Sequence, residues 1–211
     1  RTHGKDSPAE PVLRDFKNIE NRDAVLDWAS HTPRLDDQGR PVTRWDGTTK
    51  ILHPVTGDEV PDPNARVQVY DYAKPRPATW PDADFIVGNP PFIGNKRMRD
   101  ALGDGYAEAL WAAYPRMPQS ADFVMFWWEK AALAARDLKL TTGTTRATGA
   151  RRFGFITTNS LRQTFNRKVL EPHLSDEKAP LSLVFAIPDH PWVDAGDGAA
   201  DVGALFIEPI Q

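Results

Sequence analysis

The second half of the chain alternates continuous apolar runs with segments of helical pattern, and this alternation restricts the folds open to it. Four apolar runs predict strands, at residues 84–88, 153–159, 181–188 and 201–210. Helical patterns lie between them, at 120–139 and about 160–170. Runs without polar alternation are typical of strands covered on both faces. We therefore predict an α/β domain with a mostly parallel sheet.

The last two predicted strands form an exception to the parallel arrangement. Only a Gly/Asp-rich loop, at about residues 188–200, separates them. Since a parallel connection needs a crossover, usually a helix, these strands are predicted to be antiparallel neighbours. The C-terminal strand is thus expected to run against the rest of the sheet.

The first half of the chain has a different composition. Residues 1–15 are polar and predict a linker, so the folded domain is expected to span 16–211. Residues 16–26 predict a strand that runs into an acidic turn. Residues 27–80, rich in Pro, Gly, Asp and Thr, predict a loop-rich insertion. Within this insertion, residues 50–60 contain a Thr-Gly turn and predict a β-hairpin.

Composition excludes several classes of protein. The chain has no cysteine, which rules out disulfides, thiolate zinc sites and a cysteine nucleophile. Its five histidines have no ligand spacing, so we predict no metal site. No signal peptide and no apolar run of about 18 residues is found, so we expect a cytoplasmic protein that does not contact membranes.

A rigid turn follows the first apolar run of the second half. Proline has a fixed φ and lacks an amide hydrogen, so Asn89-Pro90-Pro91 predicts a stiff, extended turn. This turn presents the Asn89 side chain and the Pro90 carbonyl as acceptors, and Phe92 as a stacking surface. In open α/β sheets, ligands bind beyond the carboxyl ends of the strands. The alternative interpretation is that Asn-Pro-Pro is merely an ordinary turn after a strand.

Two carbonyl acceptors beside an aromatic ring suit a planar group that carries an NH2. They can hold both hydrogens of an exocyclic amine and favour a pyramidal nitrogen with a localised lone pair, which is electrostatic catalysis without a metal. We therefore identify four candidate catalytic residues, which are Asn89, Pro90, Pro91 and Phe92.

The segment Asp84–Phe92 resembles the catalytic motif of S-adenosylmethionine-dependent amino-methyltransferases. It looks most like the adenine-N6 DNA methyltransferases of bacterial restriction and phage-defence systems. The resemblance implies a partial Rossmann-like methyltransferase sheet, S-adenosyl-L-methionine as cofactor and double-stranded DNA as partner. It also implies that Asn89 and the Pro90 carbonyl bind the N6 amine of a flipped-out adenine while Phe92 stacks on its ring.

The same resemblance implies further site residues. Asp23, in a segment similar to the family's cofactor-binding acid, would contact the cofactor together with Asn89 and Asp122. Trp192 lies where such enzymes keep a loop near the flipped base. Two of these residues have simpler alternatives: Asp23 could be a solvated turn residue, and Asp122 could act at the start of a helix capped by Ser120.

Cationic residues near two strand ends are candidates for contact with the DNA backbone. These residues are Lys96, Arg97, Arg99 and Arg162. Such contacts would position DNA without reading its sequence. Charge clusters are more often solvated surfaces, so this remains one of two interpretations.

The sequence departs from the family in one respect. The glycine-rich cofactor loop is not found, and the nearest candidate, Ala195-Gly196-Asp197-Gly198, lacks a strand-to-helix context. We expect that loop, and a target-recognition region, in the remainder of a longer polypeptide. Three alternatives stay open: an RNA adenine methyltransferase, a protein-glutamine methyltransferase, and an inactive piece that binds nucleic acid.

Overall fold

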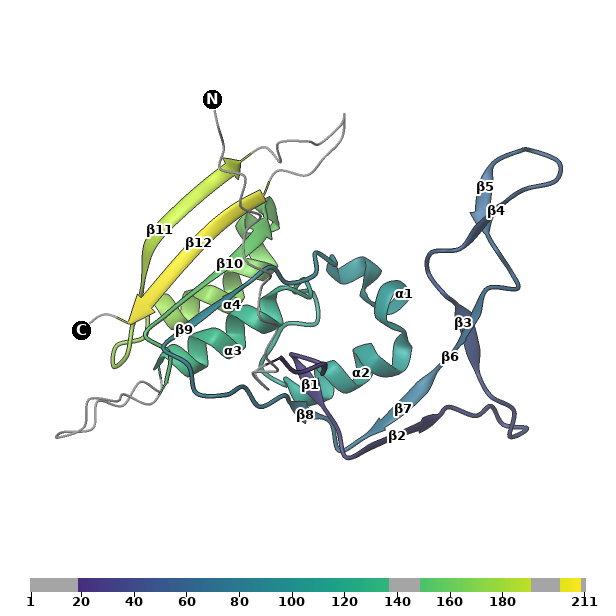
Figure 1. The fold of residues 1–211 in the computed structure, drawn as a ribbon, viewed down its shortest axis with the longest axis horizontal. Helices are drawn as coiled ribbons and strands as arrows, with labels where there is room; N and C mark the ends of the chain where they lie inside the picture. The colour runs from purple at the N-terminus through teal and green to yellow at the C-terminus, as the bar shows by residue number, and fades with distance from the viewer. Residues whose placement is uncertain (1–18, 137–148, 191–201, 210–211) are drawn as a thin grey trace, which may run out of the picture.

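The computed structural model describes residues 19–136, 149–190 and 202–209, and it shows a mixed α/β fold (Figure 1). The main sheet contains β9 (Phe85–Gly88), β10 (Arg152–Thr158), β11 (Leu181–His190) and β12 (Val202–Pro209). The helices are α1 (Met98–Leu102), α2 (Asp104–Ala113), α3 (Met125–Arg136) and α4 (Thr164–Leu174), with the 3-10 turns η1 (Asn95–Arg97) and η2 (Asn159–Arg162). Within these residues no helix is long and apolar enough to cross a membrane.

The strand order of the main sheet is β11-β12-β10-β9. β9 and β10 pair in parallel, whereas β12 is antiparallel to both β10 and β11. The predicted antiparallel pairing of the last two strands is confirmed. The predicted mostly parallel sheet is not, because β12 inserts between β10 and β11 and so reverses two of the three pairings. Sequence order alone does not reveal that a final strand enters the middle of a sheet.

Helices α3 and α4 pack against one face of this sheet (Figure 1). Trp128 of α3 is fully buried there, with its ring centre 5.4 Å from that of Phe153 and 5.5 Å from that of Phe155. On the opposite face Phe85 and Val87 are exposed. The sequence predicted strands that are covered on both faces. Among the described residues, this prediction is wrong for β9, since its second face is exposed.

The predicted helix at 120–139 begins later in the structure. α3 begins at Met125, so Ser120 is not its N-cap and Asp122 precedes it. The reason is that residues 122 and 123 are hydrogen-bonded to the segment after β9, through the Asp122 side chain and the Phe123 backbone amide. The helical conformation is interrupted at Gly103, between α1 and α2, and the φ of 90° at this residue favours glycine.

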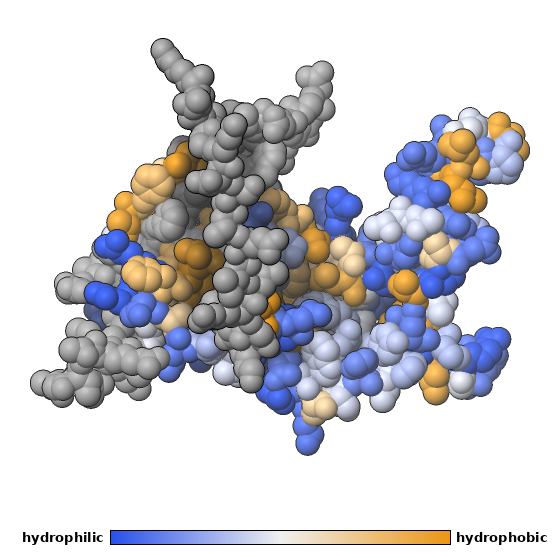
Figure 2. All heavy atoms as spheres, in the orientation of Figure 1, coloured by the Kyte–Doolittle hydropathy of each residue, from blue (hydrophilic) through white to orange (hydrophobic). Residues whose placement is uncertain are grey.

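The insertion at 27–80 forms an arm of successive antiparallel ladders (Figure 1). Their strands are β1 (Leu26–Asp27) with β8 (Arg76–Pro77), β2 (Ser30–Pro33) with β7 (Tyr70–Ala73), β3 (Thr43–Trp45) with β6 (Arg66–Gln68), and β4 (Lys50–Leu52) with β5 (Glu59–Pro61). The last pair confirms the predicted hairpin. The predicted strand at 16–26 is wrong at residues 19–25, which form no strand; residues 16–18 lie outside the described part. Figure 2 shows mostly hydrophilic residues along the arm and hydrophobic ones at its tip.

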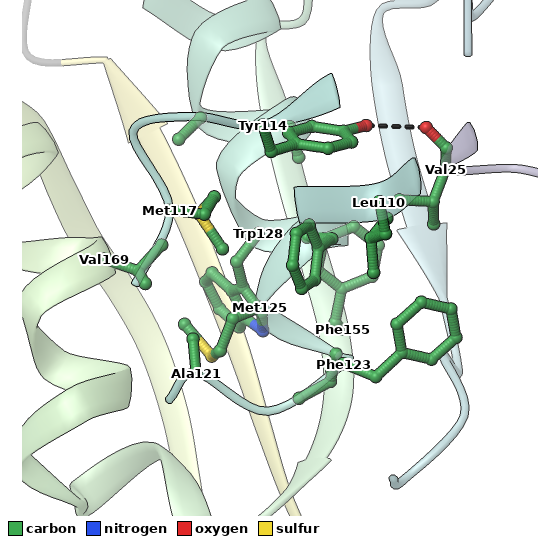
Figure 3. Packing of buried hydrophobic residues seen from close by; sticks show 14 of the residues in the cluster. Val25, Leu110, Tyr114, Met117, Ala121, Phe123, Met125, Trp128, Phe155 and Val169 are labelled. Atoms are coloured by element: carbon green, nitrogen blue, oxygen red, sulfur yellow. Dashed lines mark hydrogen bonds between the residues drawn. The ribbon is translucent and has the colours of Figure 1, made fainter. Parts of the chain in front are cut away.

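The core joins the base of the arm to α2, α3 and the sheet. In Figure 3 the Tyr114 hydroxyl, on the residue after α2, reaches the carbonyl oxygen of Val25, and this buried hydrogen bond measures 2.6 Å. Val25, Leu110 and Phe126 are fully buried nearby. The segment just before the arm is thereby fixed to the same body that carries β9.

Candidate functional site

The Asn-Pro-Pro turn lies at the carboxyl end of β9 and borders a hollow of about 330 Å³. The lining residues are Trp80, Ile86, Val87, Gly88, Asn89, Pro90, Pro91, Trp127 and Phe155. They come from β9 and its turn, from β10, from α3 and from the end of the arm. A hollow thus borders the segment where the sequence predicts a ligand site.

The turn leaves two acceptors open. Among the described residues, neither the Asn89 side-chain amide nor the Pro90 carbonyl has a hydrogen-bond partner. The Pro90 ring is buried, while Asn89 is exposed. Phe92 is 44% exposed and is not part of the lining. The arrangement can bind a group with two polar hydrogens at the edge of the hollow.

Two tryptophans, Trp80 and Trp127, form walls of the hollow, and neither was among the site residues named from the sequence. The adjacent residues Trp127 and Trp128 point about 100° apart on a helix; Trp128 is core, and Trp127 faces the hollow. Trp80 comes from the end of the arm, so no local sequence pattern could have placed it there.

Trp80 is held from both sides. Its indole Nε1 donates a 2.6 Å hydrogen bond to the Ala24 carbonyl. The Nζ of Lys130 lies 4.5 Å from the ring centre and also donates to the Ala78 carbonyl. Burial, with a smaller contribution from Arg22, lowers the pKa of Lys130 to about 8. The aromatic wall is therefore fixed to the segment that contains Asp23.

Asp23 is half-buried and its carboxylate is oriented by three donors. Oδ1 accepts from the amides of Val25 and Leu26, each at 2.8 Å, and Oδ2 accepts from the Tyr106 hydroxyl at 2.7 Å. Burial, together with this bond to Asp23, raises the pKa of Tyr106 well above its usual value, so its hydroxyl keeps its proton and donates. Asp23 does not line the hollow; its neighbour Ala24 holds a wall of it.

Asp122 lies behind the turn, and each of its carboxylate oxygens accepts a hydrogen bond from another residue. Oδ1 accepts from the Asn95 amide at 2.9 Å, and Oδ2 accepts from Nδ2 of Asn166 at 2.8 Å. It is 8% exposed and is not part of the lining. Its geometry suits a link between loops.

All four candidate DNA-backbone residues are exposed. Lys96 and Arg97 lie in η1 and Arg162 lies in η2, near the ends of β9 and β10. Arg99 lies in α1 and forms ion pairs with Asp104, at 2.7 Å, and with Glu108, at 3.2 Å.

Trp192 lies outside the described residues. Over the part of the chain that the structure describes, no group of three or more His, Asp or Glu residues could hold a metal ion.

Comparisons with known proteins give one family and one similar solved structure. The family model for the MmeI DNA-methyltransferase domain matches residues 5–208. Among solved structures, the chain is similar to the Type IIL restriction-modification enzyme MmeI in complex with DNA, at 23% identity and a TM-score of 0.36. That match covers 59% of this chain and 15% of the solved chain. No curated protein matches.

Proposed function

This chain belongs to the MmeI DNA-methyltransferase domain family, and from that premise we propose that it is the catalytic part of an adenine-N6 DNA methyltransferase in a restriction-modification system. Family membership supports DNA as the substrate over RNA or a protein amide. The proposal goes beyond family membership in specifying adenine as the base and N6 as the atom that is methylated.

One observation carries this choice: Asn89 and Pro90 are adjacent residues that both line the hollow, and among the described residues neither of their acceptors has a hydrogen-bond partner. Two acceptors there can bind both hydrogens of the adenine N6 amine. Because these dipoles are fixed before the reaction, they stabilise the positive charge that develops on nitrogen. Phe92, half-exposed beside the turn, stacks on the flipped ring, which returns roughly 1–3 kcal/mol per base.

The residues present fit S-adenosyl-L-methionine as cofactor. Asp23 offers an oriented carboxylate to the cofactor adenine, and Tyr106 and two backbone amides hold it in that orientation. The cofactor supplies an electrophilic methyl group. Asn89 accepts one hydrogen of the N6 amine and the Pro90 carbonyl accepts the other, so the nitrogen lone pair points away from both.

Double-stranded DNA and the rest of a longer polypeptide are the proposed partners. Lys96, Arg97 and Arg162 are exposed near the ends of β9 and β10 and are assigned to phosphate contact, and Trp192 is assigned to the flipped base. The cofactor loop and the target-recognition region belong to the remainder of the polypeptide. Phosphate contacts from these three cations fix orientation and leave the reading of sequence to that region.

The test supplies a radiolabelled methyl donor to this chain, alone and within the longer polypeptide, with DNA, RNA and protein substrates. We expect label in N6-methyladenine of DNA from the longer polypeptide. Asn89→Ala should lower the rate about 100- to 1,000-fold, as loss of one preorganised polar group does in other enzymes. Label in cytosine, in RNA or in protein would contradict the proposal.

A further inference from the structure

Asp122 and Asn166 form a buried polar pair behind the Asn-Pro-Pro turn. Nδ2 of Asn166 donates to Oδ2 of Asp122 at 2.8 Å, and Oδ1 of Asn166 accepts from the Asp122 amide at 3.0 Å. Asn166 is 1% exposed. Side chain and main chain of Asp122 are thus both bound by one residue of α4.

The pair holds the segment that follows the turn. Oδ1 of Asp122 accepts from the Asn95 amide at 2.9 Å, and the next amide, that of Phe123, donates to the Ile93 carbonyl at 2.9 Å. These two bonds enclose Gly94. Proline fixes φ at residues 90 and 91, and the Ile93 amide donates to the Pro91 carbonyl at 3.2 Å. The position of residues 93–95 therefore restricts where the Asn89 and Pro90 acceptors lie.

Asn166 extends the same network to the end of β10. The second hydrogen of its Nδ2 donates to the Ser160 carbonyl in η2, at 2.8 Å. All the hydrogen-bonding groups of its amide are then in use except one lone pair of Oδ1. A buried pair of this kind is sensitive to substitution, because removal of one partner leaves the other unsatisfied.

We propose that Asn166 is a positioning residue for methyl transfer, acting through Asp122 on the acceptors of Asn89 and Pro90. The proposal rests on the function proposed above, and it gives Asp122 a linking role in place of cofactor contact. Asn166 touches neither substrate nor cofactor; it holds in register the loops that follow β9 and β10.

A reciprocal exchange of the two side chains tests this role in the longer polypeptide. Asn166→Asp places two carboxylates together, and Asp122→Asn places two amide groups together. Each single change should lower kcat about 10- to 100-fold, as misplacement of a reacting group by about 1 Å can do, with the KM for DNA changed less than about twofold. The double variant restores a complementary pair, without the bond to Ser160, and should recover most of kcat.

A matched control uses another buried polar pair between α3 and α4. Nε2 of His173 lies 2.7 Å from Oε2 of Glu129, and among the described residues no hydrogen bond joins this pair to the turn. His173→Asn should lower the melting temperature and leave kcat unchanged at temperatures well below it. If the Asp122 and Asn166 variants behave in the same way, the pair is merely structural and the proposal is overturned.

Amide hydrogen exchange tests the contact on which the proposal depends, even if the single variants fail to fold. In the wild-type 211-residue chain, the Asn95 amide should exchange more slowly than the Lys96 amide, which has no described partner. Equal exchange at both positions would overturn the proposal. A wild-type polypeptide that transfers no methyl group, with Asn95 protected, contradicts the proposed function and leaves the positioning contact established.

Discussion

The hydroxyl of Tyr106 donates a 2.7 Å hydrogen bond to Oδ2 of Asp23. The two residues lie far apart in the chain, and α2 brings them together. Tyr114, at the end of the same helix, donates instead to the backbone carbonyl of Val25, at 2.6 Å. Two tyrosines therefore hold one short segment, one through a side chain and the other through the main chain.

Tyr106→Phe should weaken cofactor binding. The substitution removes the donor that orients Oδ2 of Asp23 and keeps the ring in place, so the carboxylate gains freedom. We expect an increase of about 5- to 12-fold in the Kd for S-adenosyl-L-methionine, in line with roughly 1–1.5 kcal/mol for one hydrogen bond. Isothermal titration calorimetry on the longer polypeptide measures it.

Tyr114→Phe is the matched control for that substitution. It also removes one hydroxyl bonded to residues 23–25, and it should lower the free energy of unfolding by roughly 1–3 kcal/mol because a buried carbonyl loses its donor. Its cofactor Kd should stay at the wild-type value. Equal increases in Kd for the two variants would show that Asp23 has no special part in binding.

Phe92→Ala should affect catalysis more than DNA binding. The ring is 44% exposed and stands beside the turn, so its loss removes base stacking and leaves the phosphate contacts intact. We expect the rate to fall about 10- to 100-fold, which corresponds to the stacking value of roughly 1–3 kcal/mol. Single-turnover methylation and DNA titration measure the two quantities. Equal losses in both would argue against stacking.

Lys130 predicts a pH-dependent contribution to stability. Its pKa of about 8 in the folded chain lies below the ordinary value of 10.5, because burial disfavours the charge. Between these values the unfolded chain binds more protons, so the contribution of Lys130 to stability rises as pH increases from about 8 to 10.5.

Urea unfolding across this pH range measures the effect. In the Lys130→Met variant, the free energy of unfolding should lack the rise that Lys130 contributes over this pH range. The substitution also removes the cation over the Trp80 ring. Lys168, which lies over the Phe165 ring with Nζ 5.7 Å from its centre, provides a control substitution to Met. If wild type and Lys130→Met show parallel curves, Lys130 does not titrate as described.

Gly105→Ala should disturb the contact between the arm and α2. A Cβ at this position would lie 1.7 Å from the Tyr70 carbonyl oxygen, which belongs to the backbone of β7. Overpacking of this kind costs roughly 1–3 kcal/mol or more. The free energy of unfolding should fall by that amount, and limited proteolysis should cut the arm faster.

Gly94→Ala is the comparison for Gly105→Ala. Its nearest atom would be Oδ1 of Asp122 at 3.7 Å, an ordinary contact, and its φ of −65° suits alanine. We expect stability to be unchanged or raised by roughly 0.4–1 kcal/mol. A similar loss of stability in both variants would mean that the close approach of Tyr70 to α2 is not the cause.

Local chemistry was sufficient to predict several parts of this protein. The apolar run at 84–88 and the two prolines after it predicted β9 and its turn, because proline restricts its own backbone and that of the preceding residue. The Thr-Gly turn predicted the hairpin of β4 and β5. The Asn-Pro-Pro-Phe motif also led to the family that the comparisons then identified.

Only the tertiary structure decided how distant segments meet at the turn. The insertion of β12 beside β10, the arrival of Trp80 at the hollow and the pairing of Asp122 with Asn166 each join residues that no local pattern connects. Backbone preferences act over a few residues and can be read along a chain. Directional hydrogen bonds and ring contacts depend on where the whole fold places each partner, and here that placement sets the geometry around Asn89.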